Sequence, residues 1–116
     1  MSSPNENLES TIAIAIATAL KSELGKWYWL PKLDNIFRSE GCLLAEDIAF
    51  VALAGADIPL YSREKESSVI GFISKANIEH GVELYRATGK TVQPNIDAKE
   101  ADRLLQLIVL GEIAFE

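Results

Sequence analysis

Apolar residues recur at helical spacing along much of this chain. From Leu8 to Leu24 they form an unbroken i, i+4 ladder, which is typical of a helix with one buried stripe. The run IAIAIA inside the ladder also alternates with period two, as a strand would. Because alanine is depleted in strands and the ladder continues for seventeen residues, we favour a helix over residues 8–24. The polar residues 1–7 are expected to form a flexible N-terminal arm.

The most apolar stretch of helical length is residues 43–56, LLAEDIAFVALAGA. Eleven of its fourteen residues are apolar, and its only charges are Glu46 and Asp47. A helix that is apolar on every side has to be surrounded by other elements. We therefore expect this segment to be the buried central helix of the fold, with the two acidic residues complementing the helix dipole in its first turn.

Two further helices are predicted in the C-terminal half. The first runs over residues 67–88 from a serine that can cap its N-terminus, and Lys75 and Glu79 are spaced for an ion pair on its surface. The second begins with Asp97 and Glu100, which have the spacing of a capping box.

These patterns predict an all-α fold. The segment around Pro59 is expected to break the central helix and to lead into a surface loop over residues 61–66. Residues 8–116 then form a single helical domain. We expect a small helical bundle, built around helix 43–56, whose four main helices and one short helix cover residues 8–24, 43–56, 67–88, 97–113 and 32–39.

Composition and charge exclude several functional classes. The chain has 116 residues, of which 48% are hydrophobic, and a net charge of −6. Because no segment is basic, we expect no binding to nucleic acid. The longest helix-like apolar run, Ile12–Ala17, is far shorter than the roughly 20 residues that cross a bilayer, so no membrane partner is expected. Cys42 is the only cysteine, which excludes an internal disulfide and fits a cytoplasmic protein.

His80 is the only histidine, and a helical wheel over residues 67–88 places it in the middle of the apolar face. Asn77 and Glu83 lie three residues to either side. A carboxylate beside an imidazole can raise the pKa of the imidazole and fix its tautomer, as a general base requires. The candidate catalytic residues are therefore His80, Glu83 and Asn77. The alternative is a core histidine whose polar atoms are satisfied by a neighbour.

Metal and nucleotide chemistry have little support in the sequence. A di-metal carboxylate site in a bundle requires two Glu-x-x-His motifs, and this chain has a single histidine, preceded at −3 by Asn77. The sequence has no glycine-rich phosphate loop. Glu46 and Asp47 oppose a thiolate at Cys42 electrostatically. We therefore expect no metal and no cofactor.

Trp27, Tyr28 and Trp29 are adjacent aromatic residues in a connector. Three neighbouring rings in a connector cannot all point into one core, and aromatic side chains are enriched where partners dock, so these residues are the candidate binding site. The alternative is a lid that closes one end of the bundle. Because the last helix has almost no polar face after Gln106, we also expect a homodimer that buries parts of residues 104–115.

These features predict a non-enzymatic protein-interaction module. An adaptor, an immunity-type inhibitor or a regulatory subunit would fit, acting in the cytoplasm by binding another protein or a second copy of the chain. The alternative is a small hydrolase or a small-ligand binder, which would use a semi-buried cluster of Asn77, His80 and Glu83.

Overall fold

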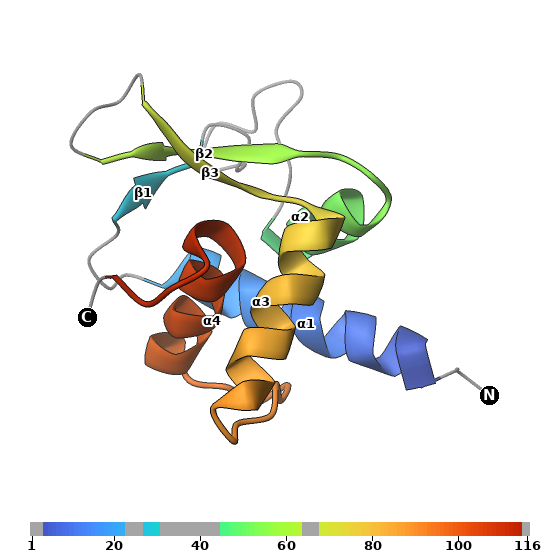
Figure 1. Ribbon diagram of the computed structural model, residues 1–116. Helices are drawn as coiled ribbons and strands as arrows, with labels where there is room; N and C mark the ends of the chain where they lie inside the picture. Colours follow the sequence, from blue (N-terminus) through green and yellow to red (C-terminus); the bar gives the residue numbers. More distant parts are fainter. Residues whose placement is uncertain (1–3, 23–26, 31–44, 64–67, 115–116) are drawn as a thin grey trace.

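The computed structural model in Figure 1 describes residues 4–22, 27–30, 45–63 and 68–114. The predicted short helix over 32–39 lies outside these residues. In chain order the elements of the described part are α1 (Pro4–Lys21), β1 (Tyr28–Trp29), α2 (Ala45–Leu53), β2 (Ile58–Ser62), β3 (Val69–Ile73), α3 (Lys75–Ala87) and α4 (Ala98–Leu110).

The three strands form an antiparallel sheet in the order β1-β2-β3, so the all-α prediction is wrong. The helical pattern predicted over 67–88 includes β3, in which Val69, Ile70 and Ile73 are β-branched and favour a strand. The helix itself begins only at Lys75. Ser74 caps it by accepting a hydrogen bond from the backbone N–H of Asn77, the third residue of the helix.

Pro59 and Phe72 stand opposite each other in the ladder between β2 and β3. Because proline has no N–H, this pair cannot exchange two hydrogen bonds. The Phe72 carbonyl accepts a hydrogen bond from Asn77 Nδ2 at 2.9 Å. Ile70 is the extra residue of a bulge in the same strand. The bulge interrupts the regular edge of β3, which discourages the addition of a further strand.

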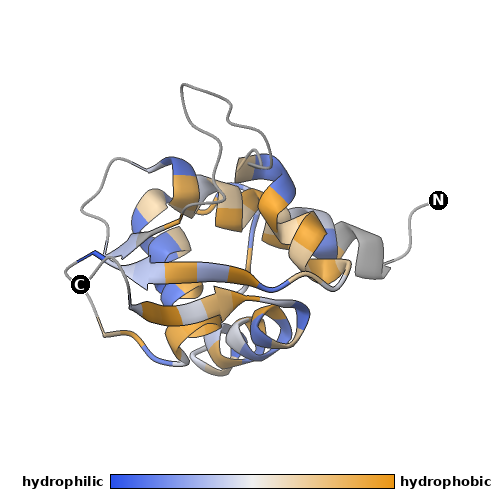
Figure 2. Cartoon of the chain, turned by 90° about the horizontal axis from the view of Figure 1, so that it is seen from above, coloured by the Kyte–Doolittle hydropathy of each residue, from blue (hydrophilic) through white to orange (hydrophobic). Residues whose placement is uncertain are grey.

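The sheet covers one side of the helices (Figure 1). β3 contacts α3 and α4, and the inward side chains Ile58, Leu60 and Ile73 are buried. On the outer face Val69 and Phe72 are 44% and 41% exposed. Figure 2 views the molecule from this side and shows the strands lying over the helices.

The buried centre of the fold is α4. All six residues from Leu104 to Val109 are buried, and α1, α3 and β3 pack around them. The segment predicted at the centre, 43–56, is described from residue 45 and forms the shorter helix α2. It buries one face through residues such as Ile48, whereas Phe50 is 46% exposed. The three alanines of this helix lie on the buried face, and Glu46, Asp47 and Phe50 are exposed, so the helix is covered on one side only.

α1 packs against both α2 and α4 and follows the predicted i, i+4 ladder. Because α2 and α4 both cover α1, more than one face of this helix is buried between Ile12 and Leu20. The helix begins at Pro4, a residue that is favourable in the first turn, so residues 4–7 of the predicted arm are helical. No helix in the described part of the chain has both the length and the apolar character needed to cross a membrane.

Gly71 of β3 and Gly81 of α3 allow two backbones to approach α4 closely. A Cβ atom added to Gly81 would lie 2.6 Å from the Ile108 Cα atom. One added to Gly71 would lie 2.5 Å from the Val109 carbonyl oxygen. Both separations are far shorter than the contact distance of about 3.5 Å between non-bonded heavy atoms. Side chains at these positions would therefore push α3 and β3 away from the centre.

We predict that Gly81→Ala destabilises the fold, although alanine is the better helix former. In an exposed helix the change would stabilise by roughly 1 kcal/mol. Here the added methyl group meets the Ile108 backbone, and overpacking of this kind typically costs about 1–3 kcal/mol. Urea denaturation should therefore give a lower free energy of unfolding.

The matched control is His80→Ala at the preceding, exposed position, where we expect a change within about 0.5 kcal/mol. A Gly81→Ala protein that is as stable as the unmodified chain would contradict the close contact between α3 and α4.

Candidate functional site

Asn77, His80 and Glu83 do not share a buried face of α3. His80 and Glu83 are exposed, and Asn77 is half-buried. The expected apolar face was anchored on Val69 and Ile73, which belong to β3, and this rotated the predicted face of the helix. The residues of α3 that are buried are Ile78, Gly81, Val82 and Tyr85.

Asn77 joins the first turn of α3 to the sheet. Its backbone N–H donates to Ser74 Oγ at 3.3 Å, and its side-chain amide donates to the Phe72 carbonyl. These contacts engage the side chain in the junction between β3 and α3. The three residues do not form the semi-buried cluster expected from the helical wheel, because His80 and Glu83 are exposed.

Trp27 and Tyr28 lie inside the protein, with 8% and 1% of their surface exposed. Their rings pack edge to face with centroids 4.7 Å apart, and Trp27 Nε1 donates a hydrogen bond to Asp102 Oδ1 at 3.0 Å. Burial, and then the charge of Asp102, raise the pKa of Tyr28 well above its ordinary value. Trp29 pairs with Tyr61 in the sheet. Trp27 and Tyr28 are therefore part of the buried core.

Gln106 is fully buried in α4 and both ends of its amide are satisfied. Its Nε2 donates to Asp102 Oδ2 at 2.9 Å, and its Oε1 accepts from the Ala114 backbone N–H at 2.9 Å. The pairing makes the burial of this polar group tolerable. Because α1, α3 and β3 cover residues 104–109, the apolar surface that suggested a homodimer through 104–115 is largely used within the chain.

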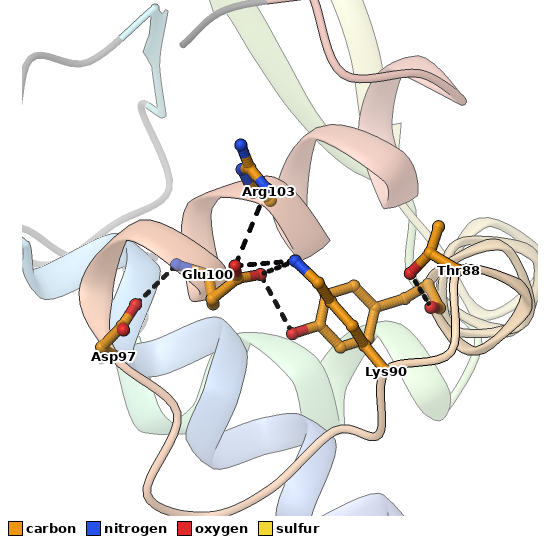
Figure 3. Close-up of polar contacts among 6 residues, drawn as sticks. Thr88, Lys90, Asp97, Glu100 and Arg103 are labelled. Carbon is orange, nitrogen blue, oxygen red and sulfur yellow. Dashed lines mark hydrogen bonds and ion pairs between the residues drawn. The ribbon is translucent and has the colours of Figure 1, made fainter.

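Glu100 connects α3, the loop that follows it and α4 (Figure 3). Its carboxylate accepts hydrogen bonds from Tyr85 Oη at 3.2 Å and from Lys90 Nζ at 2.8 Å, and Arg103 Nη1 lies 3.7 Å away. Asp97 accepts the Glu100 backbone N–H at 2.8 Å, which confirms the predicted N-cap. The glutamate side chain turns to Lys90 and Tyr85, however, and does not return to the cap.

The protonation equilibria of this cluster follow from its hydrogen bonds. The bond from Lys90 is the main reason why the pKa of Glu100 lies below its ordinary value. Burial, and then the nearby carboxylate of Glu100, raise the pKa of Tyr85. A carboxylate stabilised in its charged form by two hydrogen-bond donors and the charge of Arg103 is a poor proton acceptor. The cluster is therefore a structural link between α3 and α4.

A cleft of about 590 Å³ lies between α1 and α3. Both helices pack on α4, and the cleft separates their outer parts. Its apolar lining comes from three helices and consists of Leu8, Ile12, Leu53, Ile78 and Val82. Its charged lining consists of Glu9, Lys75, Glu79, Glu83 and Arg86.

The five charged side chains of the cleft are unpaired. Among the described residues, no ion pair involves any of them, and the expected pair of Lys75 and Glu79 is not formed. Glu83 is the predicted site residue that lines the cleft, and Asn77 and His80 do not line it. The sequence places Lys75 and Glu79 on the surface of the predicted helix, but it does not reveal that α1 also lines the cleft.

A smaller groove of about 370 Å³ lies between α1 and α2. Ile14 and Phe50 line it and are 45% and 46% exposed. An ion pair between Lys21 and Glu46 lies at its border, and the hydrogen bond from Lys21 lowers the pKa of Glu46. In contrast to the larger cleft, the charges beside this groove are already neutralised within the chain.

Within the described ranges, no group of three or more histidine, cysteine, aspartate or glutamate side chains is arranged to hold a metal ion. Comparisons with protein-family models, with curated proteins and with solved structures gave no match. The functional interpretation therefore rests on the cleft between α1 and α3, its apolar floor and its unpaired charges.

We predict that Glu100 makes stability depend on pH in the acidic range. Because the pKa of Glu100 in the folded chain lies below the ordinary value of 4.5, its stabilisation is fully present above that value. The stabilisation is lost as the pH falls through the lowered pKa. Glu100→Gln should reduce the free energy of unfolding at neutral pH by about 1 kcal/mol and should weaken its acid dependence.

Denaturant titrations at neutral pH and at about pH 3 measure both effects. Glu112→Gln, at an exposed position just after α4, is the control and should leave the acid dependence unchanged. If Glu100→Gln and the control gave the same acid profile, the link between Glu100 and Lys90 would not contribute to stability.

Proposed function

We propose that this chain is a non-enzymatic protein-interaction module that binds a helix of another protein in the cleft between α1 and α3. The observation that carries the proposal is an apolar floor contributed by three helices and bordered by five unpaired charges. Amphipathic helices bind such grooves by placing residues i, i+3, i+4 and i+7 on the floor and polar residues along the border.

The walls of the cleft favour a helical partner. They are themselves helices that pack on α4, so an added helix would lie against α1 and α3 as helices pack in a bundle. Leu8 lines the cleft and is 40% exposed, and covering it would gain roughly 25 cal/mol per Å² of apolar surface removed from water. A partner helix with matching apolar residues supplies that cover.

An adaptor, an immunity-type inhibitor or a regulatory subunit would act in this way without a cofactor or metal. The proposal places the protein in the cytoplasm, because a single cysteine suits a reducing compartment. The net charge of −6 is spread along the chain and favours a protein partner over nucleic acid.

A small-ligand binder is the second candidate. Its support is the size of the cleft, since about 590 Å³ falls within the range of roughly 300–1,000 Å³ that is common for ligand pockets. A hydrolase has less support, because His80 does not line the cleft and Asn77 is bonded to β3.

We predict that the immobilised protein captures amphipathic helical sequences from a phage library of random peptides of about 16 residues, a length of roughly 24 Å as a helix. The captured pool should be enriched in apolar residues at helical spacing. Leu8→Glu should abolish the capture, because it places a charge on the apolar floor.

Ile14→Glu is the matched control, since Ile14 is on the same helix, is similarly exposed and lines the smaller groove. This variant should capture the same pool as the unmodified chain. No enriched helical pattern, or capture that Leu8→Glu leaves intact, would overturn the proposal. Circular dichroism of both variants verifies that the helices are retained.

A further inference from the structure

The charges that line α3 form an ordered stripe. Lys75, Glu79, Glu83 and Arg86 follow one another at spacings of four, four and three residues, and all four line the cleft. On a helix these positions lie within about 80° of one another and span about 16 Å along the axis. The order of charge is therefore positive, negative, negative, positive.

Two carboxylates stand next to each other in the middle of this stripe. Glu79 and Glu83 are one helical turn apart, a spacing at which like charges repel. None of the described ion pairs neutralises either carboxylate. Along α3 the middle of the cleft is thus acidic and its two ends are basic. Glu9, on α1, adds a third carboxylate to the lining.

From this pattern, and on the basis of the proposed function, we infer the charge order of the bound helix. Beside its apolar face it carries two basic residues one turn apart at its centre and acidic residues toward both ends. Lysine or arginine at i and i+3 or i+4 would face Glu79 and Glu83, while aspartate or glutamate one turn further out would face Lys75 and Arg86. The occupant is a helix of another protein with this charge order.

The same stripe opposes symmetric pairing of two copies of this chain. A two-fold axis through the middle of the stripe would place Glu79 opposite Glu83 of the second copy, and Lys75 opposite Arg86. Every contact would then join like charges, and their repulsion opposes binding of a second copy of this chain. The charge order thus selects a different chain and rejects self-association through this cleft.

The experiment is a pair of selections from the same peptide library, one on the unmodified chain and one on the double variant Glu79→Lys, Glu83→Lys. Both glutamates are exposed and lysine forms helices as readily, so the variant should keep its fold, which a thermal melt monitored by circular dichroism verifies. Peptides from the unmodified chain should carry central lysine or arginine. Those from the variant should carry central aspartate or glutamate.

A peptide from the first pool should bind the double variant about tenfold more weakly in fluorescence anisotropy at low salt, and the difference should shrink as salt is added. Two helical pools with the same central charge would overturn the charge order and leave the proposed function standing. No helical pool on either protein would overturn the proposed function. A peptide pool that matches α3 itself, with central glutamates, would overturn the selection against self-pairing.

Discussion

The fold depends on the burial of α4. Its residues from Leu104 to Val109 are buried, so the chain has to supply a cover on every side. α1, α3 and β3 provide that cover, and the buried amide of Gln106 is satisfied at both ends within the chain. The apolar surface that these residues remove from water is a major source of the stability that offsets the ordering of the chain.

This arrangement also sets the dimensions of the cleft. Gly81 allows α3 to lie directly against Ile108, while α1 packs on α4 from another direction. The two helices therefore share a common support, and side chains of both line an open space of about 590 Å³. The link through Glu100 holds the end of α3 to the start of α4. The binding surface that we propose is thus a consequence of how the centre is packed.

The sequence predicts those structural features that depend on a few neighbouring residues. The ladder of α1 and the N-cap at Asp97 are examples, because a helical period and a capping residue act within one or two turns. The sheet was missed because β3 owes its conformation to pairing with β2, and Ile73 carries the apolar pattern across the boundary into α3. Glycine at position 71 within an apolar run and Ser74 as a cap were the available signals.

The rule that a helix apolar on every side must be surrounded holds for α4, whereas the prediction applied it to segment 43–56. Segment 43–56 and α4 are both strongly apolar, but other elements cover residues 104–109 of α4 on all sides, whereas α2 buries one face and leaves Phe50 exposed. The cleft was not predictable, since its lining requires knowledge that Leu8 and Lys75 come from helices that lie near each other. Charges such as Glu79 then gain significance only from that tertiary placement.

Native-state hydrogen exchange tests the central role of α4 most directly. The account predicts that amides between residues 104 and 110 exchange only through global unfolding, with the largest protection in the chain, and that amides of α2 exchange through smaller openings. Faster exchange in α4 than in α2, or exchange of α4 through local opening, would contradict the account.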